Sequence, residues 1–204
     1  MRTGVFGGSF DPPHMGHLVL AMQAVEQLQL DRLLWAVTAS PPHKQDQALT
    51  PVEQRVEMVQ AAIRGNPAFV LSRIEIDRPG PHYAADTLQM LKRSDPQDEL
   101  CYLIGGDSLR DLPGWYQPAL ILEACSMLGV MRRVGDCIDL TLLEEKLPGI
   151  TAKIRFIETP ILQISSSDIR ARIVENRAFR YFLPAAVYHL IKRRGFYKNL
   201  PQGK

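Results

Sequence analysis

The sequence predicts an α/β protein, built on an open, doubly wound and mostly parallel β-sheet with helices on both faces, in three α/β/α layers. Short apolar runs alternate with amphipathic stretches from one end to the other, and parallel strands need such helical crossovers. With 204 residues and 46% hydrophobic side chains, the chain can bury a sizeable core. Since no linker or internal repeat divides it, we expect a single domain over residues 1–204, with a C-terminal helical portion at about 166–197.

Six short runs, mostly apolar, are expected to be the strands. They cover residues 2–6, 32–38, 69–76, 100–104, 126–131 and 153–157. The amphipathic stretches between them are expected to be helices. The clearest of these is at 51–64, where Thr50 and Glu53 match a capping box and Pro51 takes the first helical position.

The charge balance does not fit a dedicated nucleic-acid binder, because 24 basic and 22 acidic side chains leave a net charge of only +2. Cys101, Cys125 and Cys137 form no CxxC motif, which is typical of reduced thiols and predicts a cytoplasmic protein. No apolar run has the length of a membrane span. We therefore expect neither nucleic acid nor a membrane as a partner, and the composition leaves a homo-oligomer open.

The most informative segment is Gly-Gly-Ser-Phe-Asp-Pro-Pro-His-Met-Gly-His at 7–17, which we call the early motif. It joins the first expected strand to a helix in which Leu18, Met22 and Val25 recur at helical spacing. Glycines let a backbone approach a ligand closely, and a helix start attracts anions. His14 and His17, three residues apart, fall on one side of the helix's first turn and can donate to the same anion. The early motif therefore indicates a phosphate site.

Two other interpretations of the early motif stay open. One is a capped helix with structural histidines. The other is a zinc site made by Asp11, His14 and His17, although no cysteine or further acidic ligand lies near them in the sequence.

A second phosphate signal is Ile-Ser-Ser-Ser-Asp-Ile-Arg at 164–170, which we call the late motif. Serines before an apolar helical pattern can cap exposed amides, and one serine is enough for a cap. Arg170, near the same helix start, adds a fork of donors that fits a polyphosphate.

Together, the early and late motifs resemble the nucleotidylyltransferases of the HxGH superfamily, specifically the nicotinate-nucleotide adenylyltransferases. The resemblance extends over nearly the whole chain and implies a Rossmann-like fold of the HxGH type. Segments at 41–44, 83–88 and 105–115 fall where that family has corresponding motifs.

The resemblance also implies roles for individual residues. The expected catalytic residues are His14, His17, Lys44 and Arg170. The expected ATP-binding residues are Gly7, Gly8, Ser9, Phe10, His14, His17, Gly105, Asp107, Ile164, Ser165, Ser166 and Arg170. The expected residues for the nicotinate nucleotide are Lys44, Tyr83, Ala84, Asp86, Trp115 and Arg133. Taken without the resemblance, Asp107 also fits an N-cap, and Trp115 fits a half-buried anchor.

The chain departs from the family pattern at four positions. Ser167 replaces a threonine, which keeps the hydroxyl, whereas Ala84 replaces a threonine or serine and loses one. Pro118 stands where many relatives have an aromatic or polar residue, and Val134 replaces the proline of an Arg-Pro-Gly motif.

The activity that the resemblance implies is transfer of the adenylyl group of ATP to the 5′-phosphate of nicotinate mononucleotide, which gives nicotinate adenine dinucleotide and pyrophosphate in NAD biosynthesis. ATP and nicotinate mononucleotide are thus the expected partners. Mg²⁺ is the expected cofactor, bound mainly by the ATP phosphates with no assigned protein ligand, since it keeps several waters.

Three alternatives stay open on the sequence. The acceptor can be nicotinamide mononucleotide or phosphopantetheine within the same enzyme class. The chain can be a nucleotide-binding sensor without chemistry. It can also be an RNA-binding fragment of a class I aminoacyl-tRNA synthetase, although it lacks a KMSKS-type lysine loop.

Overall fold

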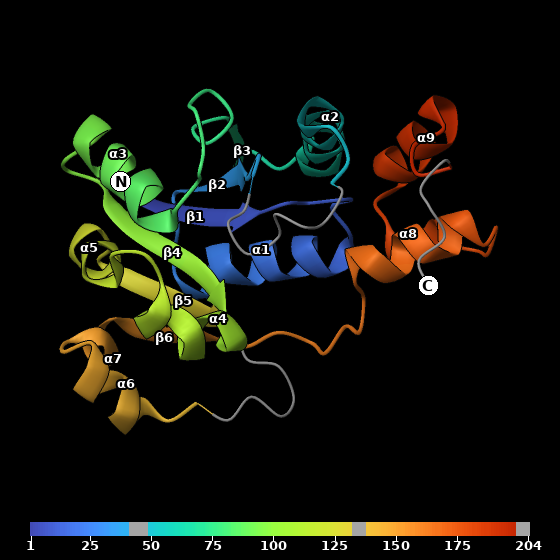
Figure 1. Cartoon of the computed structure of the whole chain (residues 1–204). Helices are drawn as coiled ribbons and strands as arrows, with labels where there is room; N and C mark the ends of the chain where they lie inside the picture. Colours follow the sequence, from blue (N-terminus) through green and yellow to red (C-terminus); the bar gives the residue numbers. More distant parts are fainter. Residues whose placement is uncertain (41–48, 132–137, 199–204) are drawn as a thin grey trace.

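The computed structural model describes residues 1–40, 49–131 and 138–198, and a single six-stranded sheet forms its centre (Figure 1). The strands are β1 (Arg2–Gly8), β2 (Arg32–Val37), β3 (Phe69–Ser72), β4 (Glu99–Gly105), β5 (Met127–Met131) and β6 (Ile154–Ile157). Their spatial order is β3-β2-β1-β4-β5-β6, and all neighbouring pairs are parallel. The predicted doubly wound sheet is confirmed.

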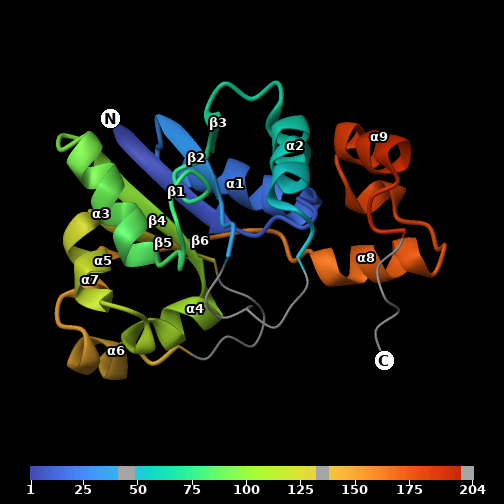
Figure 2. The same ribbon diagram turned by 45° about the horizontal axis from the view of Figure 1, so that its top comes forward.

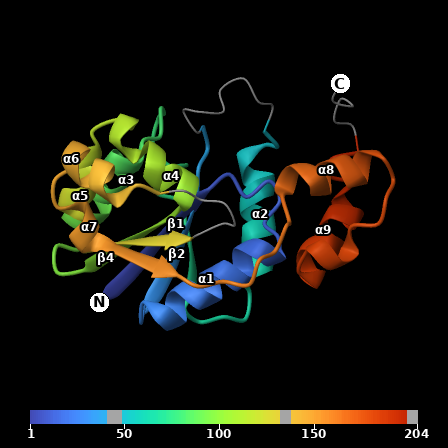
Figure 3. The ribbon, with the colours of Figure 1, turned by 90° about the horizontal axis from the view of Figure 1, so that it is seen from below.

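Helices cover both faces of this sheet, as Figures 2 and 3 show. One face carries α1 (Met15–Gln27) and α2 (Val52–Ile63), and α8 (Ser166–Val174) and α9 (Ala185–Arg194) lie beside these two helices and extend the same core, with α9 packed against α2. The other face carries α3 (Ala84–Ser94), α4 (Gly106–Asp111), α5 (Pro118–Ala124), α6 (Leu140–Lys146) and α7 (Ile150–Lys153). Two 3₁₀ turns, η2 (Leu112–Gly114) and η3 (Arg180–Phe182), complete the described elements.

Neighbouring side chains on each strand enter different cores, because the side chains of a strand alternate between its faces. Val5 packs into the core beneath α3 and α5, and the next residue, Phe6, packs into the core beneath α1 and α2. Leu103 and Ile104 divide in the same way. Burial on both faces explains why these strands are nearly continuous in apolar residues.

The strand order reverses between β1 and β4. The chain builds β2 and β3 on one side of β1, and then crosses to build β4, β5 and β6 on the other side. Ligands of open α/β sheets collect beyond the carboxyl ends of the strands at such a point. The early motif begins there with the last two residues of β1, Gly7 and Gly8, and α4 begins directly after Gly105, the last residue of β4. The first strand thus extends two residues beyond its predicted end at Phe6.

The predicted strand at 69–76 was too long, since β3 ends at Ser72. Its pairing with β2 stops at Ala36, opposite Ser72, and the chain then turns, with the amides of Ile76 and Asp77 donating to the carbonyl of Arg73. The apolar run continues past the last position that has a partner strand.

The predicted capping box of α2 was also wrong. Pro51 is the N-cap, and no side chain caps the helix. Glu53 instead forms two hydrogen bonds with the guanidinium of Arg73, and the Thr50 amide donates to Asp11. Tertiary partners thus replace the local pattern.

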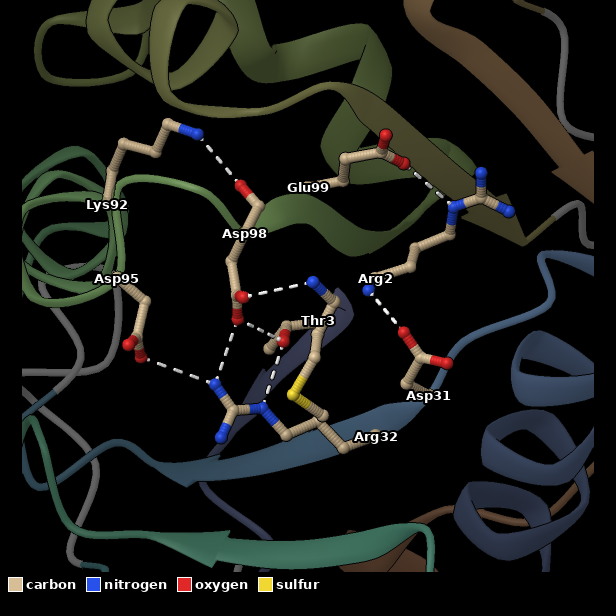
Figure 4. A network of polar contacts seen from close by, with 9 residues as sticks. Arg2, Thr3, Asp31, Arg32, Lys92, Asp95, Asp98 and Glu99 are labelled. Carbon is tan, nitrogen blue, oxygen red and sulfur yellow. Dashed lines mark hydrogen bonds and ion pairs between the residues drawn. The ribbon is translucent and has the colours of Figure 1, made fainter.

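The amino ends of β1, β2 and β4 are tied by a polar network, shown in Figure 4. The Thr3 hydroxyl, which is buried, donates to Asp98 at 2.7 Å. Arg32 donates to the Thr3 hydroxyl at 2.9 Å and to Asp98 at 2.9 Å. These contacts join three neighbouring strands and support their register. They lie at the ends of the strands remote from the early motif and so do not enter the candidate site.

Candidate active site

The early motif makes a tight turn around a buried aromatic ring. Phe10 is 1% exposed and has a backbone φ of +46°, a conformation that residues other than glycine rarely adopt. Its ring folds back over Gly8, where an added Cβ would come within 2.9 Å of the ring. It also packs on Trp35 and edge-on to His17. Glycine is therefore required at position 8 by the close approach of this ring.

The two histidines of the early motif lie face to face, as their spacing predicts. The rings of His14 and His17 stack with centroids 3.7 Å apart. The backbone N–H of His14 donates to Nδ1 of His17 at 3.1 Å, so in a neutral His17 the proton is on Nε2, which is a donor. An added Cβ at Gly16 would lie 3.1 Å from the His14 ring, so the ring leaves little room for a side chain there.

Burial lowers the pKa of His14 to about 4, because the ring is 7% exposed and its charged form is poorly solvated. Its Nδ1 atom is buried without a hydrogen-bond partner among the described residues. His14 is thus a neutral imidazole at pH 7, with an unsatisfied polar atom in the turn that we expect to receive phosphate.

This shift predicts a pH dependence of folding. The unfolded chain protonates its histidines near pH 6.5 and the folded chain protonates His14 only near pH 4, so stability should fall as the pH drops from 6.5 to 4, by up to about 3 kcal/mol. Urea unfolding at pH 4.5 and pH 7 measures the loss. His14→Asn should show a smaller loss than the wild-type protein, and an equal loss in both would contradict the assignment.

The late motif contacts the early motif directly. The Ser166 hydroxyl donates to the Pro12 carbonyl at 2.8 Å, and Nη1 of Arg170 donates to the Asp11 carbonyl at 2.7 Å. Ser165 caps α8 by accepting from the Asp168 amide. Cβ of Ile164 lies 4.0 Å from the position of a Cβ on Gly16. Segments more than 150 positions apart in the sequence are therefore one structural unit.

A buried arginine that the sequence analysis missed stabilises the loops around the early motif. Arg55 of α2 is 1% exposed, and its guanidinium donates to four backbone carbonyls at 2.8 to 3.1 Å. The acceptors are Ser9 after β1, Thr38 and Ala39 after β2, and Thr50 before α2. Arg55 thus ties together the loops that leave the two central strands.

The Asp11 carboxylate, which the zinc interpretation requires, has other partners. It accepts from the Thr50 amide at 3.1 Å and from the Tyr197 hydroxyl at 2.9 Å. Among the described residues, no three His, Cys, Asp or Glu side chains are grouped so that they could hold a metal ion.

Gly105 and Asp107 lie where β4 ends and α4 begins. Gly105 is the N-cap of α4, so the N-cap interpretation of Asp107 was wrong by position. Asp107 lies in the first helical turn, and its carboxylate accepts from the Ser108 amide at 2.9 Å. Because β4 pairs with β1, this turn and the early motif lie at the same edge of the sheet.

The segments expected at the nicotinate meet through a residue that the sequence analysis did not name. Tyr83, the N-cap of α3, stacks on Tyr116 with ring centroids 4.3 Å apart. Trp115 is half-buried against the core beneath α3 and α5. Ala84 and Asp86 lie in the first turn of α3. The adjacency of Tyr116 to Trp115 was the available signal.

Two of the expected site residues, Lys44 and Arg133, lie outside the described residues, as do Pro41 to His43.

Among the described helices, none combines the length and the apolar composition that a membrane span requires.

The sequence pattern of the cytidylyltransferase-like family matches residues 5–172. A probable nicotinate-nucleotide adenylyltransferase of Thermomicrobium roseum is 42% identical over 199 residues, which cover 98% of this chain and 92% of the relative. A probable nicotinate-nucleotide adenylyltransferase of Thermus thermophilus is 43% identical over 198 residues, covering 97% of this chain and all of the relative. The chain belongs to the cytidylyltransferase-like family, among its nicotinate-nucleotide adenylyltransferases. The family resemblance drawn from the two motifs is confirmed.

Solved structures agree with this cytidylyltransferase-like fold. A Plasmodium falciparum nicotinic acid mononucleotide adenylyltransferase complexed with APC superposes with a TM-score of 0.75 at 21% identity, covering 96% of both chains. The same protein complexed with NaAD gives a TM-score of 0.76 at 19% identity, covering 96% of this chain and 97% of that one. At these identities the likeness establishes the fold.

Proposed function

We propose that this protein transfers the adenylyl group of ATP to the 5′-phosphate of nicotinate mononucleotide, giving nicotinate adenine dinucleotide and pyrophosphate in NAD biosynthesis. The observation that carries the proposal is the contact of the early and late motifs, in which Ser166 and Arg170 bond to the carbonyls of Pro12 and Asp11. Relatives over 40% identical along nearly the whole chain, named as probable enzymes of this activity, support it. The same contacts support one domain over residues 1–204.

The chemistry needs donors and cations more than a base. The acceptor phosphate is already a nucleophile at neutral pH, so the protein must offset the repulsion of two anions and align them. In the proposal, ATP phosphates lie against the early motif, with Nε2 of His17 donating to the phosphoryl oxygen that gains charge. Arg170 keeps further N–H groups beyond the one on Asp11 and serves the phosphates from the other side. We assign Lys44 to phosphate binding from the resemblance.

We propose that Mg²⁺ enters with ATP. The groups of the two motifs are mostly N–H and O–H donors, which suit phosphate oxygens rather than a cation, so the phosphates would hold the ion. When bound, Mg²⁺ neutralises phosphate charge while keeping several waters.

The proposed nicotinate subsite lies at the start of α3. The stacked rings of Tyr83 and Tyr116 offer an aromatic surface, and the first amides of a helix have no intrahelical acceptor and attract a carboxylate. Trp115 and Arg133 complete the subsite in the proposal. Amides that await a carboxylate reject a carboxamide, since its NH₂ group leaves them without a partner.

A pyrophosphate-release assay with Mg-ATP tests the function and the acceptor together. We expect kcat/KM for nicotinate mononucleotide to exceed that for nicotinamide mononucleotide by about 10²-fold or more, and phosphopantetheine to be inactive. Equal rates with the two mononucleotides would overturn the assignment of nicotinate mononucleotide as the acceptor. If no pyrophosphate is released with any of the three acceptors, the proposed enzymatic activity is wrong and a nucleotide sensor is favoured.

Arg170→Ala should raise the KM for ATP about tenfold or more, because a charge-assisted hydrogen bond is lost and the two motifs separate. Initial rates at varied ATP measure it. The matched control is Arg177→Ala, which removes an exposed pair with Glu175 and should change nothing. An unchanged KM for ATP in Arg170→Ala would contradict the assignment.

A further inference from the structure

Asp11 is an unexpected residue to find buried beside a site for anions. Its side chain is 1% exposed, and each carboxylate oxygen accepts one hydrogen bond, Oδ2 from the Thr50 amide and Oδ1 from the Tyr197 hydroxyl. Its backbone carbonyl accepts from Arg170. We call these four residues the Asp11 junction. Three separate parts of the chain thus converge on one residue of the early motif.

Tyr197 reaches this junction from beyond the end of α9. It is 6% exposed, and its hydroxyl also lies 3.4 Å from Sδ of Met58. Its φ of +70° is unfavourable for a residue with a side chain, so tertiary contacts must hold it there. Burial raises the pKa of Tyr197 and the Asp11 carboxylate raises it further, so the hydroxyl keeps its proton and stays a donor.

The Asp11 junction is adjacent to the groups that the proposed function assigns to ATP. The peptide that carries the Asp11 carbonyl leads directly to Pro12, which accepts from Ser166, and then to His14. A shift of Asp11 would therefore move the histidines relative to the late motif.

We propose that Tyr197 is a positioning residue for the ATP site: its hydroxyl holds Asp11, and with it the early motif, in the arrangement that binds the triphosphate. The inference rests on the proposed function. Apparent affinity falls with the fraction of molecules in the competent arrangement. By reciprocity, bound ATP should stabilise the docked position of Tyr197.

Tyr197→Phe removes the hydroxyl and keeps the ring. Calorimetry with Mg²⁺ and α,β-methylene-ATP, whose α–β linkage is not cleaved, should show a Kd about five- to tenfold higher than in the wild-type protein. The KM for nicotinate mononucleotide should stay within about twofold, since a local hydrogen bond affects its own surroundings first. Tyr181→Phe is the matched control, because this ring is 87% exposed, and its Kd should not change.

The split between ATP affinity and stability decides the role. A lower melting temperature with an unchanged Kd would overturn the proposal, because Tyr197 would then be only structural. Equal weakening of both substrates would overturn it too. The failure of the proposed function would be distinguishable, because calorimetry needs no turnover. If the wild-type protein releases no pyrophosphate, the proposed function is refuted, and the Kd values for the analogue can still be compared.

The wild-type protein supplies a second test if the variant does not fold. Hydrogen exchange of the amides of Tyr197 and Lys198 should slow when Mg²⁺ and α,β-methylene-ATP are added. Exchange that is the same with and without the analogue would overturn the proposal.

Discussion

Replacing His17 by alanine should lower kcat about 10²- to 10³-fold, the usual cost of losing one preorganised donor to developing charge. The KM for ATP should change only a few-fold, because Arg170 and Ser166 still hold the two motifs together. His17 is placed for this role: its Nδ1 accepts from the His14 amide, which leaves Nε2 as the donor, and its ring is stacked on His14. Steady-state pyrophosphate release measures both constants.

A second variant separates the donor from its structural bond. His17→Asn places an oxygen where Nδ1 stands, so it can still accept from the His14 amide, but it has no group at the position of Nε2. Both variants should lose turnover equally if Nε2 is the catalytic atom. Recovery of the rate in His17→Asn would instead assign the effect to the His14 bond. His189→Ala, on the exposed side of α9, is the control and should keep wild-type rates.

The sheet and the two motifs could be predicted because their signals are local. Each strand is an apolar run, and three serines precede an amphipathic pattern. The glycines after the first run were wrongly taken as the turn itself, because Gly7 and Gly8 still pair with β2 and the turn begins after them. Parallel strands then bring their carboxyl ends to one edge, so the early and late motifs, which come after the first and the last predicted strand, could be expected near one another. The hydrogen bond from Ser166 to the Pro12 carbonyl shows this contact in detail.

The missed residues act over long distances in the sequence. The hydrogen bond from Tyr197 to Asp11 spans 186 positions, and no periodic pattern of the sequence around either residue predicts it. The stacking of Tyr83 on Tyr116 joins two loops in the same way. The capping box failed for a related reason. Thr50 and Glu53 have the right spacing, but Asp11 and Arg73 are stronger partners that only the folded chain supplies.

The burial of Arg55 could have been predicted from its position in the helical pattern, although not from the composition. In a helical sequence an arginine is usually solvated, yet Arg55 falls within the apolar stripe formed by Val52, Val56 and Val59. A charge in that position must have buried partners. Here they are backbone carbonyls that belong to the loops after β1 and β2.

Arg55→Met should therefore reduce the free energy of unfolding by about 3–5 kcal/mol, the usual result of removing one partner from a buried charged cluster. The methionine fills much of the volume, but it leaves the carbonyls of Ser9, Thr38, Ala39 and Thr50 without this donor. The Asp11 carboxylate, whose negative charge partly opposes the lowering of the pKa of Arg55 by burial, also loses a nearby positive charge. Urea denaturation measures the loss.

The matched control is Arg73→Met, which removes an exposed guanidinium paired with Glu53 and Asp77 and should cost far less stability, because solvent screens exposed ion pairs. Arg55→Lys keeps the charge but cannot form the fork of bonds, so its stability should fall between the wild-type protein and Arg55→Met. If Arg55→Met and Arg73→Met lose the same stability, then the loops after β1 and β2 do not depend on this guanidinium, and the hydrogen bonds of Asp11 with Thr50, Arg170 and Tyr197 hold the early motif without it.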